Sequence, residues 1–146
     1  MMPKGALDIL LVEDNEGDVE MTRRALSRAG TPCTLSVANN GNQALDYLHG
    51  EAAGGLPPSR PDLILLDINM PRMDGKTFLR TVKHDESLKA IPVVMFTSSE
   101  SPTDIRECYE SYASGYVVKP FDGRQYAERL DQVVNFWGRI GELPNA

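Results

Sequence analysis

The sequence has little cysteine, no long apolar run and no excess of basic residues. Its two cysteines, Cys33 and Cys108, have neither metal-ligand spacing nor a paired framework, so we expect reduced thiols in a cytoplasmic protein. The longest apolar runs have only the length of strands, too short for a membrane span, and residues 1–6 are too short and mixed for a signal peptide. The formal net charge of -6 argues against nucleic-acid binding and favours protein partners and metal ions.

A chain of 146 residues has the size of one domain. We expect a single domain over residues 1–146, with a core over about 7–134. The predicted strands are 7–12, 34–38, 62–67, 92–97 and 116–118, and the predicted helices are 16–29, 42–49, 75–83, 103–113 and 123–140. Residues 50–58, rich in Gly and Pro, predict a flexible loop. This alternation indicates an α/β fold with a doubly wound, five-stranded parallel sheet covered by helices on both faces.

Asp67 follows directly after the apolar run 63–66, which has the pattern of a fully buried strand. A carboxylate there lies at the carboxyl edge of the sheet, where open α/β folds bind their ligands. A lone Asp after a strand is more often a cap of the next turn. However, the ends of three other predicted strands also carry polar groups. Glu13 and Asp14 follow the first strand, Thr97 ends the fourth, and Lys119 follows the fifth. These strands are neighbours in a doubly wound sheet, so we expect the four groups to converge.

Three carboxylates in one place repel one another unless a cation lies among them. Hard oxygen ligands favour Mg²⁺, which binds through one or two carboxylates together with water and phosphate oxygens. We expect Asp14 and Asp67 to be direct ligands, the backbone carbonyl of Asn69 to be a third, and Glu13 to act through water.

These groups fit phosphoryl transfer to Asp67, whose carboxylate can form an aspartyl phosphate. Mg²⁺ and Lys119 would neutralise the charge on the phosphoryl oxygens, and the Thr97 hydroxyl would donate a hydrogen bond to one of them. Each feature has an ordinary alternative when taken alone: an acidic pair is a cap, a Lys-Pro pair is a turn, and a Thr at a strand end is a satisfied core hydroxyl. Their joint placement on four predicted neighbours favours the phosphoryl site.

Four segments of the sequence, residues 9–15, 65–75, 94–98 and 115–121, resemble the motifs of the receiver domain of two-component response regulators. The resemblance covers about residues 7–134. It implies a flavodoxin-like fold with strand order 2-1-3-4-5, phosphorylation of Asp67, and Mg²⁺ bound by Glu13, Asp14, Asp67 and the Asn69 carbonyl. It assigns the conserved hydroxyl and amine to Thr97 and Lys119. It also implies that Tyr116 is an aromatic switch coupled to Thr97, and that the Lys119-Pro120 bond is cis.

The resemblance implies a phosphoacceptor signalling protein, not an enzyme with other substrates. A nucleotide-binding loop at 75–77 is excluded because Met70 stands where that motif needs Gly. An aspartyl-phosphate phosphatase would need an acid where Asn69 stands. The remaining alternative is a receiver fold that binds partners without phosphorylation, for which we would expect Asp67, Thr97 or Lys119 to be lost.

We expect no DNA-binding domain after the predicted receiver, and therefore output through protein contact, phosphate storage or phosphoryl relay. The apolar residues of the last helix cover about half of its circumference, which is wider than the stripe of roughly 100° that a core-facing helix needs. Such a surface either closes on its own domain or binds a partner. We expect a homodimer through the last and fourth helices, with these interface residues: Tyr109, Tyr112, Val133, Phe136, Trp137 and Ile140.

A narrower resemblance rests on residues 13–18, the loop from Gly50 and the ending 133–137. These segments are similar to the stand-alone regulators that accompany bacterial phytochrome histidine kinases, which are commonly homodimers. The implied partner is therefore a histidine kinase of the phytochrome type.

Overall fold

The structure is a computed structural model that describes residues 5–50 and 60–144. Within these ranges, five strands form one parallel sheet of order β2-β1-β3-β4-β5. The strands are β1 (Leu7–Val12), β2 (Cys33–Ala38), β3 (Leu63–Leu66), β4 (Val93–Thr97) and β5 (Gly115–Val118). The helices are α1 (Glu16–Arg28), α2 (Gly41–Leu48), α3 (Gly75–His84), α4 (Pro102–Glu110) and α5 (Gly123–Asn135), followed by the π-helical turn η1 (Phe136–Ile140). The predicted fold and strand order are confirmed. Apart from Gly50, the predicted loop 50–58 lies outside the described residues.

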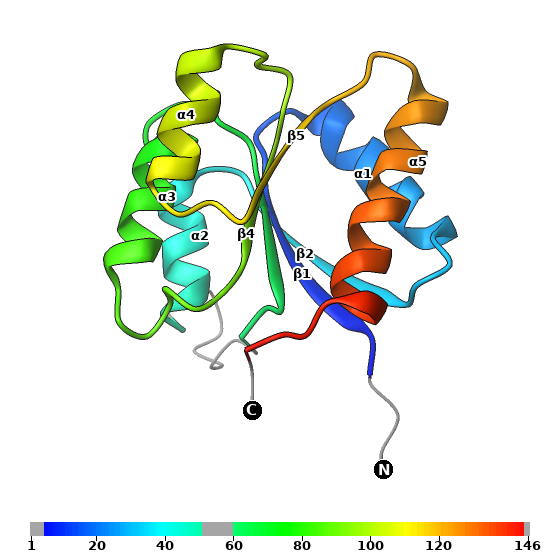
Figure 1. The fold of residues 1–146 in the computed structure, drawn as a ribbon, viewed down its shortest axis with the longest axis horizontal. Helices are drawn as coiled ribbons and strands as arrows, with labels where there is room; N and C mark the ends of the chain where they lie inside the picture. Colours follow the sequence, from blue (N-terminus) through cyan, green and yellow to red (C-terminus); the bar gives the residue numbers. More distant parts are fainter. Residues whose placement is uncertain (1–4, 51–59, 145–146) are drawn as a thin grey trace.

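Helices cover the sheet on both sides, with α1 and α5 on one face and α2, α3 and α4 on the other (Figure 1). The central strand β3 is completely buried and pairs with β1 and β4. Because strand side chains alternate between faces, Leu63 and Leu65 join the core beside α1 and α5, whereas Ile64 and Leu66 join the core beside α2, α3 and α4. A strand that is apolar on both faces can carry polar groups only where it ends.

Side-chain caps fix where the helices begin. The side chains of Asn15, Asn40, Asp74, Ser101 and Asp122 accept backbone N–H bonds at the starts of α1 to α5. Four of these helices start just after the carboxyl end of a strand, and so their amino-terminal turns surround that edge of the sheet. No helix of the described residues is both long and apolar enough to span a bilayer.

One predicted helix end is wrong, and one predicted helix ends as expected but changes its type before it does. Helix α4 ends at Glu110 instead of residue 113, because Tyr112 has a φ of 71°, in the left-handed region that a helix cannot continue through. The predicted last helix, 123–140, changes at Phe136 into the π-helical turn η1. This turn closes with a hydrogen bond from the Gly141 N–H to the Phe136 carbonyl.

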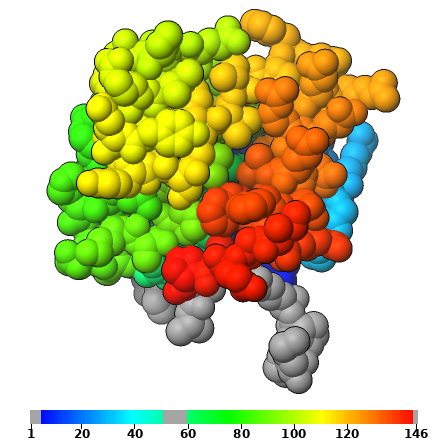
Figure 2. Space-filling model, viewed as in Figure 1, coloured from blue at the N-terminus to red at the C-terminus, as the bar shows by residue number. Residues whose placement is uncertain are grey.

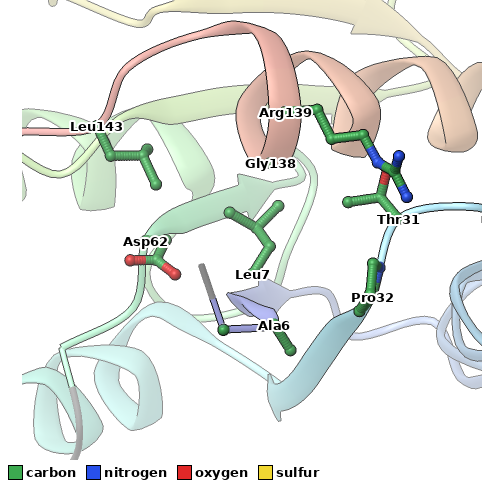
Figure 3. Close-up of a pocket in the computed structure, with 9 residues that line it drawn as sticks. Ala6, Leu7, Thr31, Pro32, Asp62, Gly138, Arg139 and Leu143 are labelled. Atoms are coloured by element: carbon green, nitrogen blue, oxygen red, sulfur yellow. The ribbon is translucent and has the colours of Figure 1, made fainter. Parts of the chain in front are cut away.

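The turn η1 packs across the amino end of the sheet, beside a cavity of about 370 Å³ (Figure 3). Gly138 lies so close to the chain before β2 that a Cβ there would come within 2.6 Å of the Thr31 methyl carbon. Arg139 donates to the Thr31 hydroxyl at 3.1 Å and to the Gly30 carbonyl at 2.5 Å. Part of the wide apolar arc of the last helix is therefore used inside its own domain.

We expect Gly138→Ala to lower the free energy of unfolding by about 1–3 kcal/mol, because overpacking forces the backbone of η1 away from Thr31. Gly30→Ala is the matched control, since a Cβ at Gly30 meets nothing within 4 Å. Urea unfolding followed by circular dichroism measures both variants. Equal stability of the two would contradict the close packing of η1.

Candidate functional site

Three carboxylates converge at the carboxyl edge of the sheet. Glu13 and Asp14 follow β1, Asp67 follows β3, and one oxygen of each lies within 4.8 Å of the others. Glu13 and Asp67 are buried, at 1% and 7% exposure, whereas Asp14 is exposed. The Asp67 side chain is held in place, because the Ile68 N–H donates to its Oδ1 at 2.8 Å. The structure thus brings together the three predicted acidic residues.

Gly75 allows α3 to start directly behind Asp67. Its N–H donates to the Ile68 carbonyl at 2.8 Å, and a Cβ at this position would lie 2.0 Å from the Asp67 carbonyl oxygen. Only a residue without a side chain permits this approach. The turn between Asp67 and α3 therefore fixes the backbone from which the Asp67 carboxylate projects.

Lys119 supplies a buried positive charge at the centre of the site. Its N–H donates to the Thr97 carbonyl at 2.8 Å, which anchors the end of β5 to the end of β4. Its Nζ lies 2.5 Å from Glu13 Oε1, 2.8 Å from Asp18 Oδ2 and 3.6 Å from Asp67 Oδ2. Burial lowers the pKa of Lys119, but the hydrogen bonds to Asp18 and Glu13 outweigh this and raise it. Lys119 is therefore a fixed cation shared among carboxylates.

Glu13 carries the largest electrostatic cost in the site. Burial raises the pKa of Glu13 to about 7, and the charge of Asp67 adds to this shift, although the hydrogen bond from Lys119 opposes it. One ammonium group does not offset several carboxylates in a buried place. A divalent cation at this edge would favour the ionised form of Glu13.

The donor set fits a hard divalent metal ion. Asp14 and Asn69 line one hollow beside the acidic residues, together with Ile68, Met70, Pro71, Asp74, Lys76 and Asp104. Carboxylates of Asp14 and Asp67, with the Asn69 carbonyl, could bind such an ion, and the buried Glu13 could reach it through water. All of these ligands are oxygen atoms, and Mg²⁺ prefers oxygen.

Thr97 is the last residue of β4, and Tyr116 lies within the neighbouring strand β5, opposite Met95. Thr97 is completely buried, and its hydroxyl accepts from the Ser99 N–H at 3.4 Å. Tyr116 is half-buried, and its hydroxyl donates to the Ser99 carbonyl at 2.9 Å. The two predicted switch residues are thus connected to each other through the backbone of Ser99.

The sequence reasoning missed two groups of residues at this edge. Asp18, in the first turn of α1, forms an ion pair with Lys119. The second group is a bridge between α3 and α4, in which Lys76 pairs with Asp104 at 2.5 Å and Ser99 donates to Asp104 at 2.6 Å. The hydrogen bond from Lys76 lowers the pKa of Asp104. Both groups are polar residues in the first turns of helices that start at the carboxyl edge, and this was the available signal.

One expectation about the backbone is wrong. The described peptide bonds are all trans, including Lys119–Pro120. The trans isomer is the intrinsically favoured one, by roughly 0.5–1 kcal/mol before proline, and in this geometry it already brings Lys119 to the carboxylates.

Four of the predicted interface residues are exposed, and two are half-buried. Tyr109, Tyr112, Phe136 and Ile140 are 49%, 73%, 46% and 65% exposed, while Val133 and Trp137 are half-buried against the core beside α1 and α5. Figure 2 shows α4 in yellow and α5 with η1 in orange to red on the face of the molecule that is turned toward the viewer. A groove between β5 and the last helical segment is lined by residues that include Val117, Val133, Phe136 and Trp137.

The family model described as "Response regulator receiver domain" matches residues 9–131. The chain belongs to this family. Its members are signalling proteins that interact with histidine kinases and bind a divalent metal ion. The receiver assignment made from the sequence motifs is confirmed.

Curated relatives of this receiver chain include two regulators from different organisms. The "Probable methanogenesis regulatory protein FilR2" of Methanothrix harundinacea is 36% identical over 129 residues, which are 88% of this chain and 82% of FilR2. The "Response regulator Rcp1" of Synechocystis is 32% identical over 138 residues, 94% of this chain and 93% of Rcp1. A solved structure of Rcp1 in a Mn²⁺-bound form is 30% identical, with a TM-score of 0.87, over 94% of this chain and 99% of that one.

Among solved structures, the phosphorylated cyanobacterial phytochrome response regulator RcpA matches with a TM-score of 0.90. It is 34% identical, and the match covers 97% of this chain and 100% of RcpA. The chain is thus related to phytochrome response regulators, as the narrower sequence resemblance predicted.

The raised pKa of Glu13 predicts how the stability of the metal-free protein depends on pH. The pKa is about 7 in the folded protein and 4.5 for the free side chain, so the folded state binds this proton more tightly than the unfolded state does. The associated stability is complete below about pH 4.5 and is lost as the pH rises through about 7. Between pH 6 and 8 we expect a loss on the order of 1 kcal/mol in the free energy of unfolding.

Thermal unfolding in EDTA at pH 6 and pH 8 measures this loss. Glu13→Gln is the control because it cannot titrate, and saturating Mg²⁺ should flatten the profile of the wild type by favouring the ionised carboxylate. Parallel pH profiles of wild type and Glu13→Gln in EDTA would contradict the raised pKa.

Proposed function

We propose that residues 1–146 act as a single receiver unit that accepts a phosphoryl group on Asp67 from a histidine kinase, in a reaction that depends on Mg²⁺. The product signals by protein contact, and the chain catalyses only its own phosphorylation and dephosphorylation. The observation that carries this proposal is the placement of Lys119 beside Asp67 and Glu13, with a third carboxylate, Asp14, free to bind a metal ion. Its two free cysteines favour a cytoplasmic setting.

In the reaction, a carboxylate oxygen of Asp67 attacks phosphorus in line with the phosphohistidine nitrogen. The new P–O bond forms as the P–N bond breaks, and the imidazole nitrogen keeps the bonding pair and takes up a proton from solvent. Lys119 lies 3.6 Å from Asp67 Oδ2, close enough to neutralise the added phosphoryl charge. When bound, Mg²⁺ supplies further charge neutralisation at these oxygens.

Phosphorylation of Asp67 changes the conformation of Thr97 and Tyr116. The Thr97 hydroxyl moves toward the phosphoryl group, and the Tyr116 ring turns into the space that it leaves. This exchange breaks the hydrogen bond between the Tyr116 hydroxyl and the Ser99 carbonyl. Two discrete arrangements of these side chains give the two states that a signalling switch requires.

The proposed phosphodonor is a histidine kinase of the phytochrome type. The similarity to Rcp1 and RcpA over nearly the full length of each supports this partner. The relative FilR2, whose name refers to methanogenesis, shows that similar chains occur in other pathways. A binding module that needs no phosphorylation is the alternative function, but the presence of Asp67, Thr97 and Lys119 supports the phosphoacceptor.

The proposed output surface also forms a homodimer. Tyr109 of α4, Tyr112 just after this helix, and Phe136 and Ile140 of η1 are exposed, and Phe136 also lines a groove of about 390 Å³ between β5 and the last helical segment. A two-fold axis through this face would bury these side chains against their copies. Exposed apolar area of this kind is characteristic of interaction sites.

Asp67→Asn should take up no phosphoryl group, because the amide is not a nucleophile. Intact mass spectrometry after incubation with Mg²⁺ and acetyl phosphate should show one added phosphoryl group on the wild type and on Asp46→Asn, an exposed control on α2. EDTA should prevent the addition. Labelling of Asp67→Asn at another residue would disprove the site, and an unlabelled but folded wild type would favour the binding module.

Phe136→Lys should weaken self-association by roughly tenfold or more, because it places a charge in the apolar face. The matched control is Phe121→Lys, since Phe121 is a fully exposed aromatic residue in the connection between β5 and α5 and is not among the predicted interface residues. Sedimentation equilibrium measures the dissociation constants. A similar effect of both substitutions, or no effect of Phe136→Lys, would exclude this dimer face.

A further inference from the structure

Asp18 contacts Lys119 but belongs to neither the predicted metal ligands nor the phosphoacceptor. Its Oδ2 lies 2.8 Å from Lys119 Nζ, closer than Asp67 Oδ2 at 3.6 Å. The contact joins two residues that are 101 positions apart in the sequence. An ion pair over such a separation depends on the tertiary structure and not on the local helix.

Every polar group of Asp18 is engaged. Its N–H donates to Asn15 Oδ1 at 2.9 Å, which caps α1. Its carbonyl accepts from the hydroxyl of Tyr126 at 3.3 Å, and Tyr126, 2% exposed, also bonds to the Thr22 hydroxyl at 3.0 Å. Asn15 and Tyr126 of α5 therefore each fix one backbone group of Asp18, and this leaves its carboxylate directed at Lys119.

The hydrogen bonds of Lys119 show which partner it can give up. An ammonium group has three N–H donors, and Glu13 and Asp18 accept two of them, at 2.5 Å and 2.8 Å. The Glu13 side chain is 2% exposed, so losing Lys119 would leave a buried charge without a partner. The Asp18 side chain is 30% exposed, and water can replace Lys119 there at much lower cost.

We propose that Asp18 is a positioning residue that holds Lys119 in the unphosphorylated state and competes with the phosphoryl group for it. This inference rests on the proposed phosphorylation of Asp67. On phosphorylation, Lys119 keeps its bond to Glu13 and exchanges Asp18 for a phosphoryl oxygen, while Asp18 becomes solvated. Asp18 thus keeps the lysine ordered in the site and lowers the affinity of the site for the phosphoryl group.

The ion pair can be tested without any phosphoryl ligand. The ¹⁵Nζ resonance of Lys119 should change in Asp18→Asn, which keeps the shape of the side chain and removes its charge. It should stay in place in Glu16→Gln, which removes one charge from the same turn of α1 at an exposed position. Circular dichroism verifies that both variants are folded.

The competition can be tested with beryllium fluoride in the presence of Mg²⁺, with ¹⁹F NMR to measure the bound fraction. Asp18→Asn should bind this phosphoryl mimic about three- to fivefold more tightly than the wild type, the amount expected for a partly exposed ion pair. Glu16→Gln should give a clearly smaller change. Asp18→Glu, which restores the charge, should return the affinity toward that of the wild type.

The possible outcomes separate the two proposals. A Lys119 resonance that is unaffected by Asp18→Asn shows that the pair does not exist and overturns the inference. Affinity for beryllium fluoride that is unchanged or weaker in Asp18→Asn, or equally raised in Glu16→Gln, overturns the competition while leaving phosphorylation of Asp67 intact. A folded wild type that binds no beryllium fluoride overturns the proposed function and the competition together.

Discussion

The site contains more negative than positive charge, because one buried ammonium group, that of Lys119, is paired with several carboxylates. Lys119 lies within 4 Å of Glu13, Asp18 and Asp67, and Asp14 adds a further acid beside them. Burial is the largest cause of the raised pKa of Glu13, and the charge of Asp67 adds to it. A divalent metal ion would offset the excess negative charge. Under the proposed function, the carboxylate partners of Lys119 would exchange when a phosphoryl group is added to Asp67.

The sheet makes this concentration of charge possible. Strand β3 is apolar on both faces, so acidic residues stand only beyond its ends, and Asp67 follows Leu66 at the carboxyl end. Parallel pairing with β1 and β4 brings their ends to the same level, in the register Val12 to Leu66 to Met95. The buried strands hold the backbone of the acidic residues in place. Polar residues in the first turns of the helices then contact these residues and Lys119.

The sequence was sufficient for those parts of the site that depend on strand ends. Asp67, Thr97 and Lys119 could be predicted because a buried strand is recognisable from a short apolar run, and its end is then known to within a residue. Asp18 could not, since its contact with Lys119 requires α1 to be held by Tyr126 of α5. The early end of α4 at Glu110 and the π-helical turn η1 were also missed, because they follow from a left-handed Tyr112 and from Gly138 packing on Thr31. The helical periodicity of a sequence indicates neither the backbone φ of a single residue nor a close tertiary contact.

Ser99 connects the charged site to the proposed output face. Its N–H bonds to Thr97, its carbonyl accepts from Tyr116, and its hydroxyl donates to Asp104, which Lys76 ties to α3. Because all three polar groups of Ser99 are engaged, a shift of the Thr97 hydroxyl toward Asp67 removes one bond and alters the geometry of the other two. Asp104 lies in the first turn of α4, so the helix that carries the exposed Tyr109 is bonded to Ser99, which is itself bonded to Thr97. Under the proposed function, a change of charge at Asp67 would reach α4 through this chain of hydrogen bonds, with no need for a large rearrangement of the sheet.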